Sequence, residues 1–368
     1  MKHYNPPKMG IMSGVSLVFI GTTPRLFLAT FTEQLSINGQ AAWLGIVMNS
    51  LSSLIMMLTL LFLINKLDGD FFSVCNKLVG KRVSWIIKLF YSLLFLINAA
   101  LLLREYVEST KISALHDANY LLITLVYGFT VMIVAYLGIE AIARAGCFVL
   151  PFILFGSILV VILLYPFYQI YHLLPFLGNG FKPLLISGFR GAGYNLLAVL
   201  IVILAPSYQN VRTMKACFLW GLGGSAALKL LYALVFLITF GVEVGMEKIL
   251  PFFEMARLVF INHYLQRIEA PLIIIWVMFG LLAIALSLYI AVYLAAHILN
   301  LTKLRPLIPL LSVLTITISM LPENFDQVTK YEGLLLNAET IGIYLIPLVL
   351  LAAYLVKGKD KKCSSEQA

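Results

Sequence analysis

The sequence predicts an all-α integral membrane protein with about ten transmembrane helices, arranged as two five-helix repeats of inverted topology whose first helices are interrupted. Three observations support this prediction. Hydrophobic residues make up 61% of the chain and charged residues 12%, against about 25% charged residues in ordinary soluble domains. Ten apolar windows approach the roughly 20 residues that a helix needs to cross a hydrocarbon core of about 30 Å. Glycine or proline interrupts the first and the sixth of these windows.

The ten windows predict one membrane domain over residues 1–356, with a first repeat at about 9–165 and a second at about 184–356, followed by a charged tail at 357–368. Because the fourth and fifth windows nearly touch, nine or eleven spans are also compatible with the pattern. The windows cover residues 9–31, 41–64, 85–103, 120–136, 142–165, 184–205, 216–242, 270–299, 307–321 and 341–356.

The basic residues are shared unevenly between the two sides of the predicted membrane domain. Fifteen of the 26 Lys and Arg residues fall on the side that carries both termini, and eight fall on the other side. The positive-inside rule therefore predicts that both termini are cytoplasmic. The formal net charge of +9 is expected to contact anionic membrane lipid. A nucleic-acid partner is not expected, because the chain lacks a soluble basic surface.

Gly21 and Pro24 interrupt the first window. Glycine removes the Cβ barrier to non-helical conformations, and proline removes an amide donor and disfavours the helical conformation of the preceding residue, Thr23. Backbone groups that are freed at membrane depth must be buried in protein or line a cavity. Gly21, Thr22 and Thr23 are therefore candidate ligand-binding residues. The alternative is a proline-kinked helix whose neighbours satisfy the free groups.

The sixth window contains a run with three glycines, Gly188, Gly191 and Gly193, before its apolar stretch. Interrupted hydrophobic segments at corresponding positions of two halves indicate a transporter-type binding site near the bilayer midplane. Gly191, Gly193, Tyr194 and Asn195 are therefore candidate ligand-binding residues. The alternative is that this run lies at the outer edge of the membrane.

Polar side chains in the third and eighth windows are candidates for the lining of such a cavity. They are Tyr91 and Asn98 in the third window and Ser287 in the eighth. For Asn98 and Ser287 a contact between packed helices is the alternative, because polar side chains also hydrogen-bond across helix interfaces in membranes.

Charged residues inside the windows are functional candidates, because burying a charge in a membrane is costly. Lys229 lies near the centre of the seventh window, where its amine could replace a coupling cation or carry a proton. Arg25 could pair with Glu33, approach a ligand carboxylate or extend to the membrane surface. No acidic partner for Lys229 is evident from the sequence.

No motif indicates an enzyme. The five histidines have no metal-ligand spacing, and the chain has no nucleophile elbow and no phosphate-binding glycine loop. We therefore expect no catalytic residue, no metal and no cofactor. The four scattered cysteines are expected to be free thiols. Residues 243–269 are expected to contain an interfacial helix, and Glu140 and Arg144 are expected to form a local ion pair.

Several short motifs, in their order and spacing, resemble those of one family. They are Ile20-Gly21-Thr22 with Pro24-Arg25 in the first window, and the segments at residues 136–144, 174–180 and 266–277. The pattern resembles the spore germination protein B family, the permease-like subunits of nutrient germinant receptors. That family is a branch of the amino acid–polyamine–organocation transporter superfamily.

The resemblance implies a LeuT-type fold of five plus five helices, with a small-nutrient site beside unwound first and sixth helices. It also implies two partner subunits, a larger membrane subunit with soluble domains and a lipoprotein, and a location in the cell or spore inner membrane. The chain departs from the family pattern twice. Pro24 follows Gly21 more closely than is usual. Relatives often carry an acidic residue just after the glycine of the sixth helix, whereas the nearest polar residue here is Asn195.

These observations predict a membrane subunit of a spore nutrient germinant receptor, which binds a small nutrient such as an amino acid and triggers germination. The alternative is a proton- or sodium-coupled amino acid transporter. The scarcity of acidic residues in the predicted spans argues against coupled transport, and Lys229 argues for it. A third interpretation, a purely structural scaffold, would make both interruptions accidental.

Overall fold

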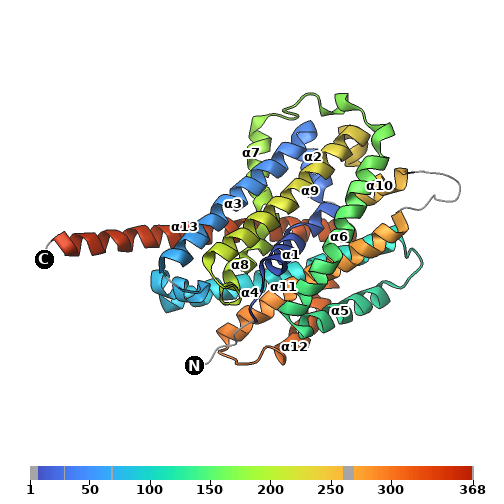
Figure 1. Cartoon of the computed structure of the whole chain (residues 1–368). Coiled ribbons are helices and arrows are strands. Elements are labelled where there is room, and N and C mark those ends of the chain that lie inside the picture. Colours follow the sequence, from blue (N-terminus) through green and yellow to red (C-terminus); the bar gives the residue numbers. More distant parts are fainter. Residues whose placement is uncertain (1–6, 29, 68, 260–268, 367–368) are drawn as a thin grey trace.

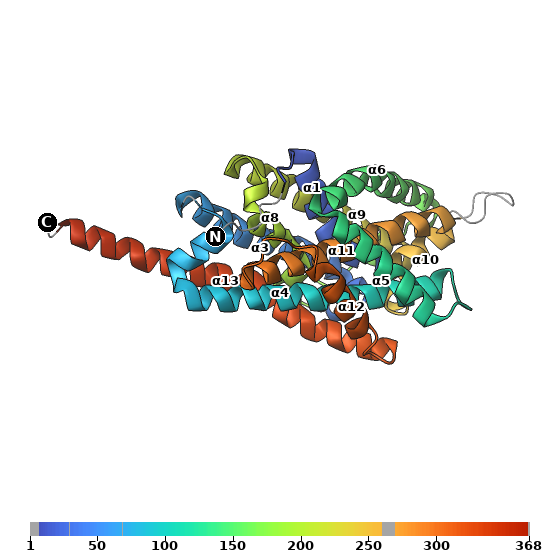
Figure 2. The same cartoon turned by 90° about the horizontal axis from the view of Figure 1, so that it is seen from below.

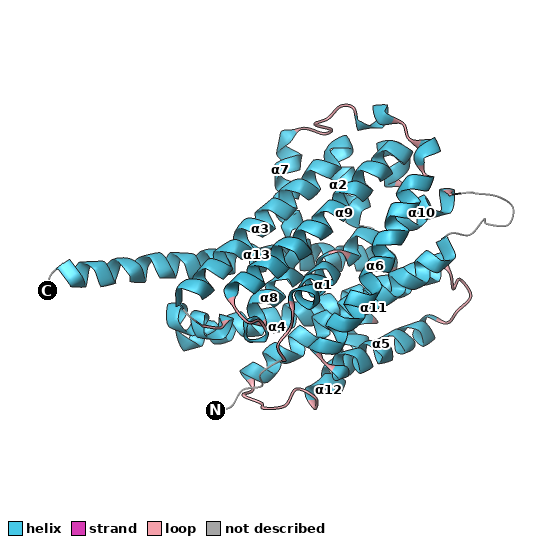
Figure 3. Ribbon diagram, viewed as in Figure 1, coloured by secondary structure: helices cyan, strands magenta, loops and turns pink. Residues whose placement is uncertain are grey.

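In the computed structural model, the chain folds into a bundle of helices (Figures 1 and 3). The structure describes residues 7–28, 30–67, 69–259 and 269–366, and the regular elements within these ranges are all helices. Eight helical stretches of the described residues are long and apolar enough to cross a membrane. Two shorter apolar helices, α1 (Ile11–Thr22) and α12 (Leu307–Ser319), accompany them.

The first five spans lie between α1 and α6. The first span consists of α1, the 3₁₀ helix η1 (Pro24–Phe27) and α2 (Thr30–Asn38). Its interruption begins at Thr23 and ends at Leu28, whose backbone is extended (φ −107°, ψ −176°), so it lies a few residues later than Gly21. The next four spans are α3 (Ala42–Leu67), α4 (Phe71–Ser113), α5 (Tyr120–Leu137) and α6 (Ile139–Leu163).

The last five spans begin with a second interrupted helix. The sixth span consists of α7 (Phe181–Arg190), the 3₁₀ helix η5 (Gly191–Val199) and α8 (Leu200–Ile203). Its interruption is therefore a nine-residue stretch of 3₁₀ helix, which is wound more tightly than the α-helix around it. A 3₁₀ stretch inside an α-helix is often a functional hinge. The remaining spans are α9 (Val211–Met246), α11 (Glu269–Ile298), α12 and α13 (Phe325–Glu366), and the short helix α10 (Pro251–Leu258) lies between α9 and α11.

Two details of the connections agree with the sequence analysis. The fourth and fifth spans are separate helices, because Gly138 between α5 and α6 has φ 94° and ψ 174°, which ends the first helix. Helix α10 lies in the region where an interfacial helix is expected, and it packs on α9, α11 and η1. The rest of that expected helix, at residues 260–268, lies outside the described residues.

The tenth span is longer than its apolar window. Helix α13 begins at Phe325, well before residue 341, and its far end extends beyond the bundle (Figure 2). Glu332 and Glu339 lower the hydropathy of its first half, yet their exposed fractions are only 8% and 0% because both face neighbouring helices. In the same way α4 continues past residue 103 and buries Glu105. The expectation that few acidic residues lie within the spans is therefore wrong.

The two candidate glycines, Gly21 and Gly193, allow helices to approach each other closely. Gly21 lies inside α1, and a Cβ atom there would be 2.9 Å from the Cβ atom of Leu197 on η5. A Cβ atom on Gly193 would be 2.9 Å from the side chain of Leu336 and 3.0 Å from its carbonyl oxygen, on α13. Neither glycine has a positive φ. Their structural role is thus close packing, whereas the sequence analysis expected them to relieve non-helical backbone.

Candidate ligand-binding site

A cavity of about 40 Å³ lies between the two interrupted spans. Helices α3 and α9 complete its walls. A polar cavity of this size holds a few water molecules or a small polar group. It is lined by Arg25, Thr30, Phe31, Gln34, Ile46, Asn49, Tyr194 and Lys229. The site is therefore polar at the first interruption and on α3 and α9, with Phe31 and Ile46 as its apolar walls.

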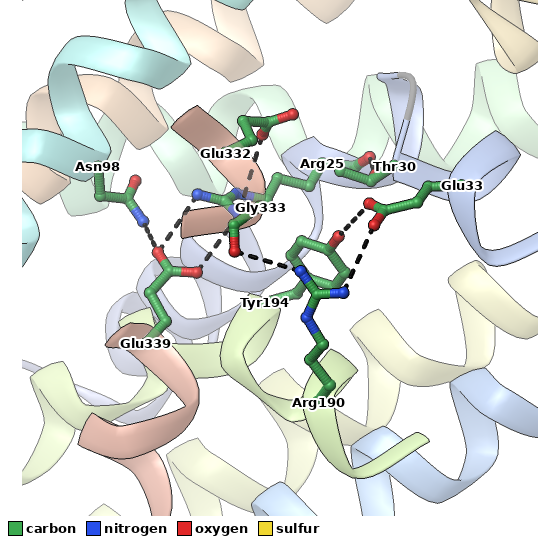
Figure 4. A network of polar contacts seen from close by, with 9 residues as sticks. All are labelled: Arg25, Thr30, Glu33, Asn98, Arg190, Tyr194, Glu332, Gly333 and Glu339. Carbon is green, nitrogen blue, oxygen red and sulfur yellow. Dashed lines mark hydrogen bonds and ion pairs between the residues drawn. The ribbon is translucent and has the colours of Figure 1, made fainter. Parts of the chain in front are cut away.

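Arg25 projects from the first interruption and binds Glu339 of α13 (Figure 4). Its Nη1 donates to Oε2 at 3.3 Å and its Nη2 donates to Oε1 at 3.2 Å, which is the bidentate arrangement that strengthens an arginine–carboxylate pair. Both side chains are buried, with exposed fractions of 8% and 0%. Glu332 lies 4.0 Å from Nη1 of Arg25, and Asn98 donates its amide N–H to Oε1 of Glu339 at 2.5 Å.

A second, more exposed group of charges joins the two interrupted spans (Figure 4). Tyr194 of η5 donates its hydroxyl to Glu33 of α2 at 3.3 Å, and Nη1 of Arg190 lies 3.8 Å from the same carboxylate. Arg190 also donates to the carbonyl oxygen of Gly333 at 3.2 Å. The ring of Tyr194 lies under the guanidinium of Arg25, 5.3 Å from it, within the range of a cation–π contact. Tyr194 thus contacts both groups of charges.

Lys229 extends from α9 into the cavity wall, and 8% of it is exposed. Its amine donates a hydrogen bond to Oδ1 of Asn195 at 2.9 Å. The amide nitrogen of Asn195 donates in turn to the hydroxyl of Ser53 at 3.0 Å. No carboxylate among the described residues lies within ion-pair distance, 4.0 Å, of the lysine amine.

The carbonyl oxygen of Arg25 in the first interruption accepts two hydrogen bonds, one from the backbone N–H of Leu28 at 3.3 Å and one from a side chain. Thr30, at the start of α2, donates its hydroxyl to the carbonyl oxygen of Arg25. The hydroxyl of Thr23 donates to the hydroxyl of Ser225 on α9 at 2.8 Å, and so attaches the start of the break to a neighbouring helix. Buried backbone polar groups generally find such partners. The interruption is therefore fixed in place on the side of α9.

The predicted ligand-binding residues fall into three groups according to their position relative to the cavity. Tyr194 lines the cavity, and Asn195 holds Lys229 from behind it. Gly191 lies against the cavity wall, since a Cβ atom there would be 2.8 Å from Nε2 of Gln34. The others are buried and are not among the lining residues: Gly21, Thr22 (whose hydroxyl bonds back to Val18), Thr23 and Gly193.

The three predicted lining residues on α4 and α11 make helix–helix contacts. Tyr91 donates its hydroxyl to the carbonyl oxygen of Gly342 at 2.8 Å, and Ser287 donates to that of Phe95 at 2.8 Å. Asn98 binds Glu339. None of these three side chains is among the residues that line the cavity. For Asn98 and Ser287 this is the packing alternative that the sequence left open, and any ligand role for the three residues stays a prediction.

Sequence reasoning missed the partners of Arg25. Of the alternatives that the sequence left open for Arg25, the pair with Glu33 does not form, because Arg25 binds Glu339, while Glu33 contacts Tyr194 and Arg190. The available signal was the single acid in the apolar stretch from residue 334 to 346, where a charge would be costly without a partner. Gln34 and Asn49 were missed as well, because Gln34 lies beyond the end of the first apolar window and Asn49 lies in a window without an interruption.

Other expectations concern residues away from the cavity. Glu140 and Arg144 form the predicted ion pair on the exposed side of α6. Cys75, Cys147 and Cys217 are free thiols. Within the described ranges, no group of three His, Cys, Asp or Glu side chains is arranged to hold a metal ion.

Sequence comparison relates the chain to one protein family. Residues 8–328 match the family model described as spore germination protein. Spore germination protein KB of Bacillus subtilis (strain 168) is 24% identical over 221 residues, and this match covers 59% of the present chain and 59% of that protein. These relatives are permease-like membrane proteins, so the expectation that the chain is not an enzyme is confirmed.

Solved structures of transporters have the same fold. Mhp1, a nucleobase-cation-symport-1 family transporter in a closed conformation with bromovinylhydantoin bound, matches with a TM-score of 0.69 at 14% identity, over 93% of this chain and 80% of that one. MhsT in complex with L-phenylalanine matches with a TM-score of 0.62 at 12% identity, over 95% of this chain and 99% of that one. The predicted LeuT-type fold with interrupted first and sixth helices is confirmed, and the chain is a multi-pass membrane protein.

Proposed function

The chain belongs to the spore germination protein family, and on this premise we propose that it is the membrane subunit of a spore nutrient germinant receptor. It binds a small nutrient such as an amino acid in the cavity between its two interrupted spans, and binding triggers germination. The observation that carries this proposal is the position of the cavity. Its walls include Arg25 of the first interruption and Tyr194 of the second, and transporters of this fold class bind their substrates between two such interrupted helices.

The contacts around the cavity suggest how binding is transmitted. Arg25 connects the first span to α13 through Glu339, and Tyr194 connects the sixth span to α2 through Glu33. A ligand that contacts Arg25 or Tyr194 changes both connections, which join segments far apart in the chain. The ligand shifts the balance between two arrangements of the helices only by the difference in its affinity for them. The partner proteins then respond to the favoured arrangement.

Equilibrium binding tests the cavity as the nutrient site. The probes are radiolabelled amino acids, and the protein is purified and reconstituted in lipid nanodiscs. Ile46 lines the cavity on α3, whereas Ile55 on the same helix is 58% exposed toward the lipid side. We expect I46F to weaken binding at least about tenfold by filling the cavity, and the matched variant I55F to bind normally. Equal binding by I46F, in a protein with an unchanged unfolding midpoint, would place the nutrient elsewhere.

A proton- or sodium-coupled amino acid transporter is the second candidate function. The observation that favours it is the buried amine of Lys229 at the cavity, a group that can replace a coupling cation or carry a proton. Uptake of labelled amino acids into liposomes, with and without a proton gradient, separates the two functions. Concentrative uptake that K229M abolishes would identify a transporter, and saturable binding without flux would identify a sensor.

The receptor role includes three further proposals. The chain assembles with a larger membrane subunit that has soluble domains and with a lipoprotein. It lies in the cell or spore inner membrane with both termini cytoplasmic, as the distribution of basic residues predicts. Its two repeats run from about residue 9 to 165 and from about 184 to 356.

Spores that carry I46F in place of the natural protein should lose their response to the nutrient, while I55F spores should keep it.

A further inference from the structure

The two basic side chains that line the cavity differ in how their charges are balanced. Arg25 has Glu339 in bidentate contact and Glu332 at 4.0 Å. Lys229 has a neutral amide oxygen as its hydrogen-bond partner and no described carboxylate within 4.0 Å. No acidic side chain is among the eight residues that line the cavity. Lys229 therefore carries the unbalanced charge of the cavity.

The amine of Lys229 also has hydrogen-bonding capacity left over. A lysine ammonium has three donors, and the one hydrogen bond that it makes to a described residue goes to Oδ1 of Asn195. The bond from Asn195 to Ser53 orients the amide so that its oxygen faces the lysine. Only 8% of Lys229 is exposed, so the remaining donors face the cavity, where water can accept hydrogen bonds but supplies no opposite charge. A buried charge with incomplete partners is costly, and an anion in the cavity would lower that cost.

We propose that Lys229 binds a carboxylate group of the ligand. This inference rests on the proposed function and names the chemical group that the site recognises. A carboxylate supplies the missing opposite charge and accepts the unused N–H groups, and a cavity of about 40 Å³ favours small carboxylates. Arg25 connects the cavity wall to α13 through Glu339, and this carboxylate already balances the charge of the guanidinium.

Thermal unfolding of the purified protein in detergent tests this assignment, because a ligand that binds the folded state raises the unfolding midpoint. The probes are acetate and glycine, which carry a carboxylate, and acetamide and glycinamide, in which an amide replaces it. The variants are K229M and K229Q, which remove the charge, and K229R, which keeps it. K88M is the matched control, since Lys88 is a half-buried lysine that contacts Phe72 and is not among the cavity residues.

We expect acetate and glycine to stabilise the wild type and K88M, and the two amides to have no effect. In K229M and K229Q the apparent affinity for both carboxylates should fall at least about tenfold, as for loss of a hydrogen bond to a charged group, and K229R should retain part of it. If acetate and glycine stabilise neither the wild type nor K88M, the assignment of Lys229 is wrong. It is also wrong if they stabilise K229M as strongly as the wild type.

Two outcomes separate this inference from the proposed function. If amino acids bind but their amides bind equally well, the carboxylate assignment fails while the nutrient site stands. If acetate binds through Lys229 but no amino acid binds more tightly than acetate, the carboxylate site stands and the amino acid function fails. K229Q keeps the test valid if K229M does not fold, because its amide can still hydrogen-bond to Asn195.

Discussion

Arg25 and Lys229 line the same cavity, but their basic groups have different partners. Arg25 is held by a buried carboxylate in two hydrogen bonds, whereas Lys229 is held by the amide of Asn195. A buried ion pair whose hydrogen bonds are satisfied forms part of the structure, and removal of one partner is strongly destabilising. A buried cation without a counter-ion is costly in the empty protein. The comparison teaches that Arg25, although it lines the cavity, is a structural residue, and that Lys229 differs from it in lacking a carboxylate partner among the described residues.

The largest effect should follow from removal of the acid that balances Arg25. E339Q leaves the guanidinium buried without a bidentate carboxylate, and we expect the free energy of unfolding to fall by about 3–5 kcal/mol. Equilibrium unfolding in mixed detergent micelles measures this change. The double variant R25M/E339L removes both charges and should be much less destabilised than E339Q. A loss below about 1 kcal/mol in E339Q would mean that the pair does not hold the helices together.

An intermediate effect is expected at Asn195. N195A removes the hydrogen-bond partner of the buried amine, and a hydrogen bond to a charged group contributes about 1.5–3 kcal/mol. The same substitution should cost less in K229M, because the charge is then absent. A double-mutant cycle measured by equilibrium unfolding gives this coupling. If the two changes are additive, Asn195 does not support Lys229, and its bond to Ser53 explains the whole cost.

A small effect is expected at the exposed ion pair between Arg190 and Glu33. Their side chains are 34% and 37% exposed, so water screens the attraction, and E33Q should lower the free energy of unfolding by less than about 1 kcal/mol. This variant is the matched comparison for E339Q, because both change a carboxylate that faces an arginine. If E33Q destabilises as much as E339Q, burial does not decide the strength of the two pairs.

The smallest loss is expected for K229M in the ligand-free protein. Methionine resembles the lysine side chain in length but needs no counter-ion, so the free energy of unfolding should be unchanged or higher. The contrasting variant is R25M, which leaves Glu339 unbalanced and should be clearly destabilised. Thermal unfolding without added carboxylate measures both. A destabilisation of K229M as large as that of R25M would show that the lysine is a structural residue as well.

The sequence predicted most of the fold because hydropathy is a local property of the chain. The ten spans and the two interruptions follow from apolar windows and from clusters of glycine and proline. The boundaries of the tenth span did not follow, since Glu332 and Glu339 lower the local hydropathy. An average over a window cannot tell an acid that faces lipid from one that faces an arginine on another helix.

The sequence by itself determined the class of the protein, its interrupted first and sixth spans and its family, because these depend on residue order and composition. Only the tertiary structure decided which acid balances Arg25, since Glu339 lies 314 residues away along the chain. It also decided that Gly21 and Gly193 serve close packing, and that Asn195 supports Lys229. In a membrane interior a buried charge is retained only where other helices supply its partners, and those partners are chosen by packing in three dimensions.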